Sequence, residues 1–317
     1  MAGVVVPDVD GLARACAALR AGELVAFPTE TVYGLGADAR RADAVARVFA
    51  AKGRPADNPL IVHLADAGQV GSVVSRWTPL ARSLAATFWP GPLTIVVDAA
   101  DTLPSVTTGG LSTVAVRVPD HPVAEALLRA VDLPVAAPSA NRSGRPSPTE
   151  ARHVADDLGD AVAVVVDGGP CPVGVESTVV DARGPRPVVL REGSITREDL
   201  GVVGETADPD ALRASPGTRY RHYAPRCRVA LVAPGEGPLV AKQSIEAGER
   251  VALVSCDAAP AEVVTATRFA DAADLARHLY AALRAAEQAG ADVVVVESVP
   301  EVGVGRAVMD RLRRAAG

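Results

Sequence analysis

Lysine is almost absent from this sequence. Its 317 residues include 32 basic ones, and only Lys52 and Lys242 among them are lysines. Lys52 stands in the segment Ala51-Lys52-Gly53-Arg54-Pro55, beside a glycine that lets the backbone turn and two residues before an arginine. A compact ammonium and a planar guanidinium on one loop suit an oligophosphate ligand. Rarity alone proves nothing, so this prediction depends on the residues around Lys52.

Other scarce features exclude whole classes of protein. Aromatic residues make up 3% of the chain, so the core must consist of Val, Ala and Leu. The four cysteines form no C-x-x-C pair, from which we expect reduced thiols and no zinc cluster. No apolar run approaches the ~20 residues of a membrane helix, and the N-terminus lacks a basic signal-peptide region. We therefore expect a cytoplasmic protein without membrane contact.

Charge and missing motifs narrow the function further. The net charge of −6 argues against a general nucleic-acid binder, although a local basic pocket is compatible with it. The sequence contains no G-x-x-x-x-G-K-[ST] loop, no G-x-S-x-G elbow and no H-E-x-x-H. Ordinary P-loop NTPases, serine hydrolases and zinc hydrolases are thereby disfavoured.

The length and a hydrophobic content of 49% predict two globular domains, each with its own core. Hydrophobic periodicity predicts helices at residues 11–21, 39–51, 79–88, 123–130 and 149–158, and strands at 24–27, 60–64, 93–97, 113–118, 134–137, 161–166, 177–181 and 187–190. Some strands are joined by connections too short for a crossover helix, so part of the sheet must be antiparallel. We predict one mixed α/β domain over residues 1–200.

The rest of the chain divides into a linker and a second domain. The linker, residues 201–227, crowds three Arg or His residues and two of the four tyrosines into the segment 219–223, so we expect it to dock on something. Residues 228–317 follow a β-α-β-α-β-α pattern, which predicts a small doubly wound, Rossmann-like domain. Because no G-x-G-x-x-G follows its first strand, dinucleotide binding is not indicated.

Two polar loops near the N-terminus are candidates for a ligand site. Residues 28–36 place two threonines and a carboxylate between a strand and a Gly-rich turn; the alternative is a turn that caps a helix. The Lys52 loop continues into Asn58 and His63, and the alternative there is a solvated charge pair at a helix C-terminus.

Two further clusters lie later in the chain. Residues 138–149 follow a buried strand and carry Ser, Asn and Arg groups; the alternative is an ordinary loop with a helix cap at Ser147 or Thr149. Residues 176–181 and 190–193 sit on late strands, where a single Ser or Arg is more often structural. Arg117 lies inside an apolar strand and needs a partner or a ligand. Together these residues favour a nucleotide-like polyanion near strand ends, with the reaction left open.

Several ordered motifs in these loops resemble a known family, the YrdC-like L-threonylcarbamoyl-AMP synthases. The motifs are Pro28-Thr-Glu-Thr-Val-Tyr-Gly-Leu-Gly36, Lys52-Gly-Arg54-Pro, Phe88-Trp-Pro-Gly-Pro-Leu-Thr94, Val116-Arg117-Val-Pro119, Pro138-Ser-Ala-Asn141 with Ser143-Gly144, and Glu176-Ser-Thr-Val-Val-Asp181. The linker and residues 228–317 look like the additions of the family's long form, so the resemblance covers nearly the whole chain. Two departures are Arg191-Glu192-Gly193, where the family has Arg-Pro-Gly, and Asp310-Arg311-Leu312, where it has Asn-Arg-Leu.

The resemblance implies an enzyme that condenses L-threonine, bicarbonate or CO₂, and ATP into threonylcarbamoyl-AMP and pyrophosphate. Mg²⁺ is expected with ATP, and no protein metal site is expected. Downstream transfer proteins would pass the threonylcarbamoyl group to tRNA next to the anticodon, with at most weak contact between tRNA and this chain.

The same resemblance assigns roles to residues. Lys52 and Arg54 would be catalytic. The residues expected to bind ATP are Lys52, Arg54, Asn58, Thr113, Ser139, Asn141, Ser147, Arg191, Arg221, His222 and Tyr223. The residues expected to bind L-threonine are Thr31, His63, Arg117, Ala137 and Ser177. Arg221, His222 and Tyr223 would close over the nucleotide as a lid.

Two alternatives stay open. The same core occurs in hydrogenase-maturation carbamoyltransferases, but the sequence shows no acylphosphatase-like or zinc-finger segment of that class. The second alternative is a non-catalytic RNA-binding or ribosome-associated protein, against which the acidic pI of about 5.5 argues.

Overall fold

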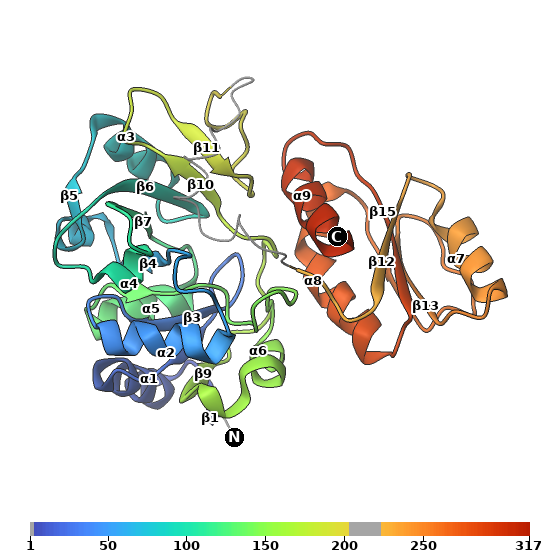
Figure 1. The fold of residues 1–317 in the computed structure, drawn as a ribbon, viewed down its shortest axis with the longest axis horizontal. Helices are drawn as coiled ribbons and strands as arrows, with labels where there is room; N and C mark the ends of the chain where they lie inside the picture. Colours follow the sequence, from blue (N-terminus) through green and yellow to red (C-terminus); the bar gives the residue numbers. More distant parts are fainter. Residues whose placement is uncertain (1–2, 203–222) are drawn as a thin grey trace. The chain divides into compact units, whose positions relative to one another are not determined.

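The computed structural model describes residues 3–202 and 223–317 (Figure 1). Within these ranges the chain forms two compact units that are not continuous in the sequence. Residues 144–147 and 173–175 group with the C-terminal residues, and the remainder up to the predicted linker forms the first unit. Residues 203–222, most of the predicted linker, lie outside the described residues.

The first unit is built on a mixed sheet. Its strands are β1 (Gly3–Val5), β2 (Val25–Phe27), β3 (Gly34–Asp38), β4 (Ile61–His63), β5 (Val74–Arg76), β6 (Leu93–Ala99), β7 (Thr113–Arg117), β8 (Val135–Ala136), β9 (Val164–Val166), β10 (Thr178–Asp181) and β11 (Val188–Arg191). They follow the order β1-β9-β2-β3-β8-β4-β7-β6-β10-β11, with β5 on β6. β4 pairs parallel with β7, whereas β6 and β7 are antiparallel, as the short connections predicted.

Helices cover this sheet. They are α1 (Val9–Ala21), α2 (Ala42–Lys52), α3 (Pro79–Phe88), α4 (Ser105–Thr108), α5 (Pro122–Val131) and α6 (Ala151–Leu158), with short 3₁₀ turns at Ala67–Ser72 and Gly159–Ala161. α2 ends at Lys52 because Gly53 takes the left-handed conformation, φ 60°, that terminates helices. The helix end thus delivers the rare lysine to a loop.

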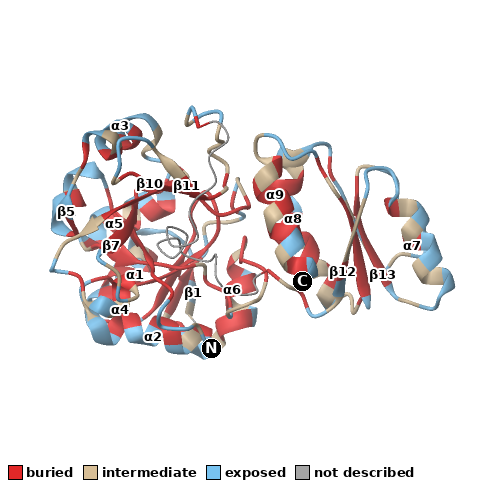
Figure 2. Ribbon diagram, turned by 45° about the horizontal axis from the view of Figure 1, so that its top comes forward, coloured by how far each residue is buried: buried red, intermediate tan, exposed pale blue. Residues whose placement is uncertain are grey.

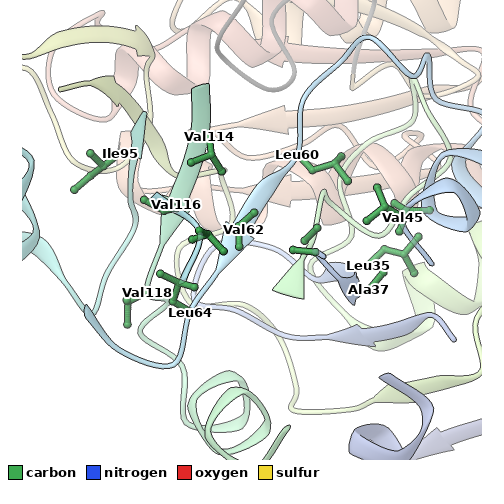
Figure 3. Packing of buried hydrophobic residues seen from close by; sticks show 14 of the residues in the cluster. Leu35, Ala37, Val45, Leu60, Val62, Leu64, Ile95, Val114, Val116 and Val118 are labelled. Carbon is green, nitrogen blue, oxygen red and sulfur yellow. The ribbon is translucent and has the colours of Figure 1, made fainter. Parts of the chain in front are cut away.

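The central strands are buried on both faces, which explains why they read as continuous apolar runs. Val62, Val114 and Val116 pack with Leu35 and the α2 side chains on one face (Figure 3). Residues one position away, such as Ile61 and Ala115, belong to a separate cluster on the other face. Figure 2 shows buried strands inside and exposed residues on the outer sides of the surrounding helices.

The second unit has a four-stranded parallel sheet. Its elements are β12 (Arg228–Val232), α7 (Gly237–Glu246), β13 (Val251–Ser255), β14 (Thr265–Arg268), α8 (Ala272–Gln288), β15 (Val293–Glu297) and α9 (Gly305–Ala316). The strand order is β12-β15-β13-β14, and all pairs are parallel. The predicted small α/β fold is confirmed, with β14 as an additional edge strand. Across the described part of the chain, no helix is long and apolar enough to cross a membrane.

The prediction of a Gly-rich turn at residues 34–36 is wrong, because these residues begin β3. β3 pairs antiparallel with β2, and glycine is required by crowding rather than by a turn. A β-carbon on Gly36 would lie 2.8 Å from Val135 Cγ1 and 2.9 Å from Phe27 Cε1. The absence of a side chain therefore lets neighbouring side chains pack over the strand.

Candidate active site

At one edge of the sheet of the first unit, the strands β4 and β7 end and the strands β6 and β10 begin. His63 and Arg117 are the last residues of the parallel strands β4 and β7, and they are register partners. β6 runs antiparallel to β7, with Ile95 opposite Val116, so its first residues lie beside Arg117. β10 is parallel to β6 and begins directly after Ser177. Polar residues from distant parts of the sequence thus meet where α/β proteins place ligands.

Arg117 is buried at this edge, with 3% of its surface exposed. Its Nη1 donates to the Thr31 hydroxyl at 3.0 Å, and its Nε donates to the main-chain oxygen of Gly91 at 3.3 Å. Its Nη2 lies 2.7 Å from a carboxylate oxygen of Glu30. The prediction that this charge needs a partner is confirmed, and Glu30 is that partner.

The loop before β3 holds Thr31 in place. The Thr29 hydroxyl donates to the Val32 oxygen at 2.7 Å and accepts from the amides of Thr31 and Val32 at 3.2 Å. It also lies 2.8 Å from the Thr31 hydroxyl. The alternative of a helix-capping turn is wrong, because a strand follows this loop. The hydrogen bonds of this loop hold the Thr31 hydroxyl where it accepts from Arg117.

His63 is buried beside Arg117. Burial and the nearby Arg117 charge lower the pKa of His63 to about 3, so its imidazole is neutral at physiological pH. The Phe27 ring meets it edge-on, with the ring centroids 6.2 Å apart. Within residues 3–202 and 223–317, the His63 Nδ1 atom has no hydrogen-bond partner. A neutral polar atom is therefore left for a ligand.

Ser177 and Arg191 form one polar unit on the other side of Arg117. The Ser177 hydroxyl lies 2.7 Å from that of Thr94, and Arg191 Nη2 donates to the Ser177 hydroxyl at 3.1 Å and to its main-chain oxygen at 2.9 Å. Ser177 and Arg191 were assigned to different substrates, and the structure brings them together.

The turn after Arg191 carries Glu192 where the family pattern has proline. Gly193 is packed against the chain before β10, so that a β-carbon there would lie 2.2 Å from the Thr178 nitrogen. Glu192 pairs with Arg197 at 2.6 Å. A glutamate in place of proline therefore adds an ion pair and leaves the glycine contact in place.

Lys52 is buried, with 3% of its surface exposed, and the alternative of a solvated lysine is wrong. Its ammonium donates to the main-chain oxygens of Ser139 at 2.5 Å and Asn141 at 2.6 Å. Burial and then the Arg54 charge lower the pKa of Lys52 well below its usual value. A bound anion would act in the opposite direction and favour the charged ammonium.

Three other predicted residues of the first unit are Arg54, Ala137 and Thr113, and each has its own position on the fold. Arg54 Nη2 donates to the Pro59 oxygen at 3.2 Å, which folds the loop over Asn58. Ala137 follows β8, and its amide donates to the Ile61 oxygen at 2.9 Å. Thr113 begins β7, at the opposite end of that strand from Arg117.

The remaining predicted residues are not part of these clusters. Ser147 is buried and groups with the second unit. Tyr223 is buried in that unit too, where its ring stacks on Tyr280 at 5.4 Å and lies 5.5 Å from the Arg311 guanidinium. The predicted lid residues Arg221 and His222 lie outside the described residues.

Sequence reasoning missed three residues of the site, Thr29, Glu30 and Thr94. All three stand inside motifs that were recognised, but no role was given to them. The unpaired charge expected at Arg117 was the available signal for Glu30, because a buried guanidinium calls for a carboxylate. Which carboxylate it meets depends on the fold and could not be read from spacing.

Comparison with known proteins gives consistent matches over both units. Residues 17–193 match the Sua5_yciO_yrdC family, described as "Telomere recombination", and residues 195–317 match the threonylcarbamoyl-AMP synthase C-terminal domain. The chain is 44% identical to a Bacillus subtilis threonylcarbamoyl-AMP synthase, over 96% of this chain and 93% of that protein. It is 45% identical to the Pyrococcus abyssi protein of the same name, over 94% and 92%.

A solved structure agrees over the whole chain. The crystal structure of P. abyssi Sua5 complexed with L-threonine matches with a TM-score of 0.91 and 41% identity, covering all of this chain and 98% of that one. E. coli YciO, at 22% identity and a TM-score of 0.56, shares the fold over 63% of this chain. With both family regions in order and the site's motifs in place, the chain belongs to the threonylcarbamoyl-AMP synthase family in its two-domain form.

Proposed function

We propose that this chain catalyses the ATP-dependent condensation of L-threonine with bicarbonate or CO₂ to threonylcarbamoyl-AMP, with release of pyrophosphate. The observation that carries the proposal is the pair of buried cationic clusters in the first unit, Arg117 with Thr31 and Lys52 with the Ser139 loop. The Arg117 cluster suits a carboxylate flanked by a hydroxyl, and the Lys52 cluster suits a phosphate. The names of the full-length relatives support the same reaction.

In this proposal the Arg117 cluster binds L-threonine. Arg117 pairs with the carboxylate, and Thr31 and Ser177 offer hydroxyls to the polar groups of the amino acid. His63 presents an uncharged nitrogen, which suits a hydroxyl better than a second charge. The main chain at Ala137, between β8 and the Ser139 loop, completes this side.

ATP would bind on the Lys52 side. Its phosphates and nucleoside would be held by Lys52, Arg54, Asn58, Thr113, Ser139, Asn141 and Arg191. An ammonium has three donors, and two of those of Lys52 go to carbonyl oxygens. The third would meet a phosphate oxygen.

The proposed chemistry needs charge placement more than a covalent nucleophile. A carbamate oxygen attacks the α-phosphorus of ATP, and the bond from that phosphorus to the departing pyrophosphate breaks. Lys52 and Arg54 would stabilise the negative charge that builds on pyrophosphate. In the described part of the chain no three His, Cys, Asp or Glu residues cluster as metal ligands, so Mg²⁺ would enter on the ATP phosphates, where it prefers to bind.

The cellular setting and the domain boundaries belong to the same proposal. We place the protein in the cytoplasm, which its four free cysteines support. Its unstable product would pass to proteins that transfer threonylcarbamoyl to tRNA. The proposed domains are residues 1–200 for catalysis, 201–227 as a linker and 228–317 as the C-terminal domain.

The test is pyrophosphate release from ATP with each L-amino acid in turn, with and without bicarbonate. The proposal expects release that requires both threonine and bicarbonate. Carbamoyl phosphate in place of bicarbonate serves as a control for the carbamoyltransferase alternative. Release with carbamoyl phosphate alone, or RNA binding without any turnover, would overturn the proposal.

A further inference from the structure

Glu30 is a buried carboxylate whose hydrogen bonding is incomplete. Only 4% of its surface is exposed, and its contact with Arg117 at 2.7 Å lacks the geometry of a hydrogen bond. Among the described residues, neither oxygen of Glu30 receives a hydrogen bond. Buried carboxylates normally accept several donors, because leaving their lone pairs unsatisfied is costly. A carboxylate that served only to neutralise Arg117 would not need two oxygens without hydrogen-bond donors.

The groups around Glu30 do not compete for its oxygens. Among the described residues, Arg117, His121 and Cys171 are titratable groups that interact with it electrostatically. Burial lowers the pKa of His121, whose Nδ1 already accepts from the Val123 amide at 3.2 Å. Burial raises the pKa of the Cys171 thiol, which therefore stays neutral. Arg117 is thus the charged member of this set that faces Glu30.

Glu30 and Arg117 together match the two ends of an α-amino acid. The guanidinium donates hydrogen bonds and suits a carboxylate, whereas Glu30 accepts them and suits an amino group. The two side chains are in contact, as the two ends of one amino acid would require. A bound amino acid would supply the donors that Glu30 lacks.

We infer that Glu30 binds the amino group of threonine and acts as the general base for its carboxylation. This inference rests on the proposed function. In the step, the lone pair of the neutral amine forms the N–C bond to CO₂, and one C–O π pair becomes a carboxylate lone pair. The proton leaving the nitrogen goes to a Glu30 oxygen. The products are a carbamate and a neutral Glu30, which later returns the proton to water.

Charge favours Glu30 over His63 for this proton. A proton on His63 would create a second positive charge beside Arg117. Burial and then the Arg117 charge already lower the pKa of His63 to about 3. A proton on Glu30 instead neutralises an anion. His63 therefore remains a neutral hydrogen-bonding group in the reaction.

The test compares Glu30→Gln and Glu30→Asp with the wild type in bicarbonate-dependent pyrophosphate release. Glu30→Gln should raise the KM for threonine and lower kcat by about 100-fold, the usual contribution of a general base, with little change in ATP affinity. The difference in kcat between Glu30→Gln and the wild type should become smaller from about pH 7 to about pH 9, because hydroxide then removes the proton from the amine. Glu30→Asp keeps a carboxylate and should keep the wild-type pH profile. Formate should restore part of the activity of Glu30→Ala.

The control is Glu297→Gln, which removes another buried carboxylate. Glu297 accepts from the Gly237 and Cys256 amides of the second unit, so this variant should lose stability and keep its pH profile. Glu30→Gln within about threefold of wild type, or a deficit that neither pH nor formate changes, would refute the role of Glu30. If Glu30→Gln does not fold, the Glu30→Asp variant is used for the decision. A folded Glu30→Asp protein whose pH profile differs from that of the wild type would contradict the inference. An inactive wild type would instead refute the proposed function.

Discussion

The ammonium nitrogen of Lys52 lies 2.6 Å from the main-chain oxygen of Asn141, 89 residues further along the chain. The same ammonium holds the Ser139 oxygen, and the Lys52 oxygen accepts from the Ser143 amide at 2.8 Å. The end of α2 and the loop after β8 are therefore fixed to each other. In the proposed site, this link sets the shape of the phosphate-binding surface.

Replacing Lys52 by alanine should abolish most activity. We expect bicarbonate-dependent pyrophosphate release to fall by about 100-fold or more, because a cation that stabilises the leaving pyrophosphate is lost. The two carbonyls left without a donor should also lower the free energy of unfolding by about 1–3 kcal/mol. Initial rates and urea unfolding measure the two effects separately.

Lys242 offers the matched control, since it is the other lysine of the chain and is exposed on α7. Lys242→Ala should change neither the rate nor the unfolding midpoint. Near-normal turnover of Lys52→Ala would remove Lys52 from the mechanism.

The buried His63 should make the protein less stable in acid. In the unfolded chain its pKa is near 6.5 and in the folded protein about 3, so between these values the unfolded state binds more protons. The free energy of unfolding should therefore fall as the pH is lowered through this window, by about 2 kcal/mol from His63 between about pH 6.5 and pH 5. This contribution to the pH dependence is half of its maximum at about pH 6.5 and vanishes above about pH 7.5.

Urea unfolding of wild type and His63→Asn at several pH values measures this effect. The variant should show a shallower pH dependence between about pH 4 and about pH 6.5. His121, whose pKa is also lowered, is present in both proteins and cancels in the comparison. Parallel pH curves for the two proteins would show that His63 titrates normally.

Gly193 should not tolerate a side chain. A β-carbon there would lie 2.2 Å from the Thr178 nitrogen and 2.5 Å from the Ser177 carbonyl carbon, and both are backbone atoms that cannot move aside. We expect Gly193→Ala to cost about 3 kcal/mol or more in unfolding free energy and to raise the KM for threonine by displacing Ser177.

The control for this effect is Gly184→Ala. The atom nearest to a β-carbon at Gly184 is the Arg186 oxygen at 3.9 Å, an ordinary contact. This variant should unfold and turn over like the wild type. A Gly193→Ala protein with the same behaviour would mean that the chain around Ser177 is not tightly packed.

Much of the first unit could be predicted because its strands are buried on both faces. Runs such as Ile61–His63 and Thr113–Arg117 carry enough apolar residues to be recognised. β3 was missed because its glycines resemble a turn, and only the neighbouring side chains show why glycine is needed. β14 was missed because Thr265–Arg268 is a half-exposed edge strand without a long apolar run.

The site was predicted through its motifs, whereas its internal contacts were not. The resemblance supplied Thr31, Arg117 and Ser177, but spacing gives no information on which side chains touch. The ion pair of Glu30 with Arg117 joins residues far apart in the sequence and depends on the order of the strands. The pairing of Arg191 with Ser177 likewise follows from the antiparallel register of β10 and β11.

The most direct measurement is mass analysis of the product formed from ATP, L-threonine and ¹³C-bicarbonate. The proposed function predicts an adenylate that contains AMP, threonine and a single ¹³C atom, formed together with pyrophosphate. Hydrolysis should release AMP from it. An adenylate of threonine without the label, or no threonine-containing adenylate at all, would contradict it.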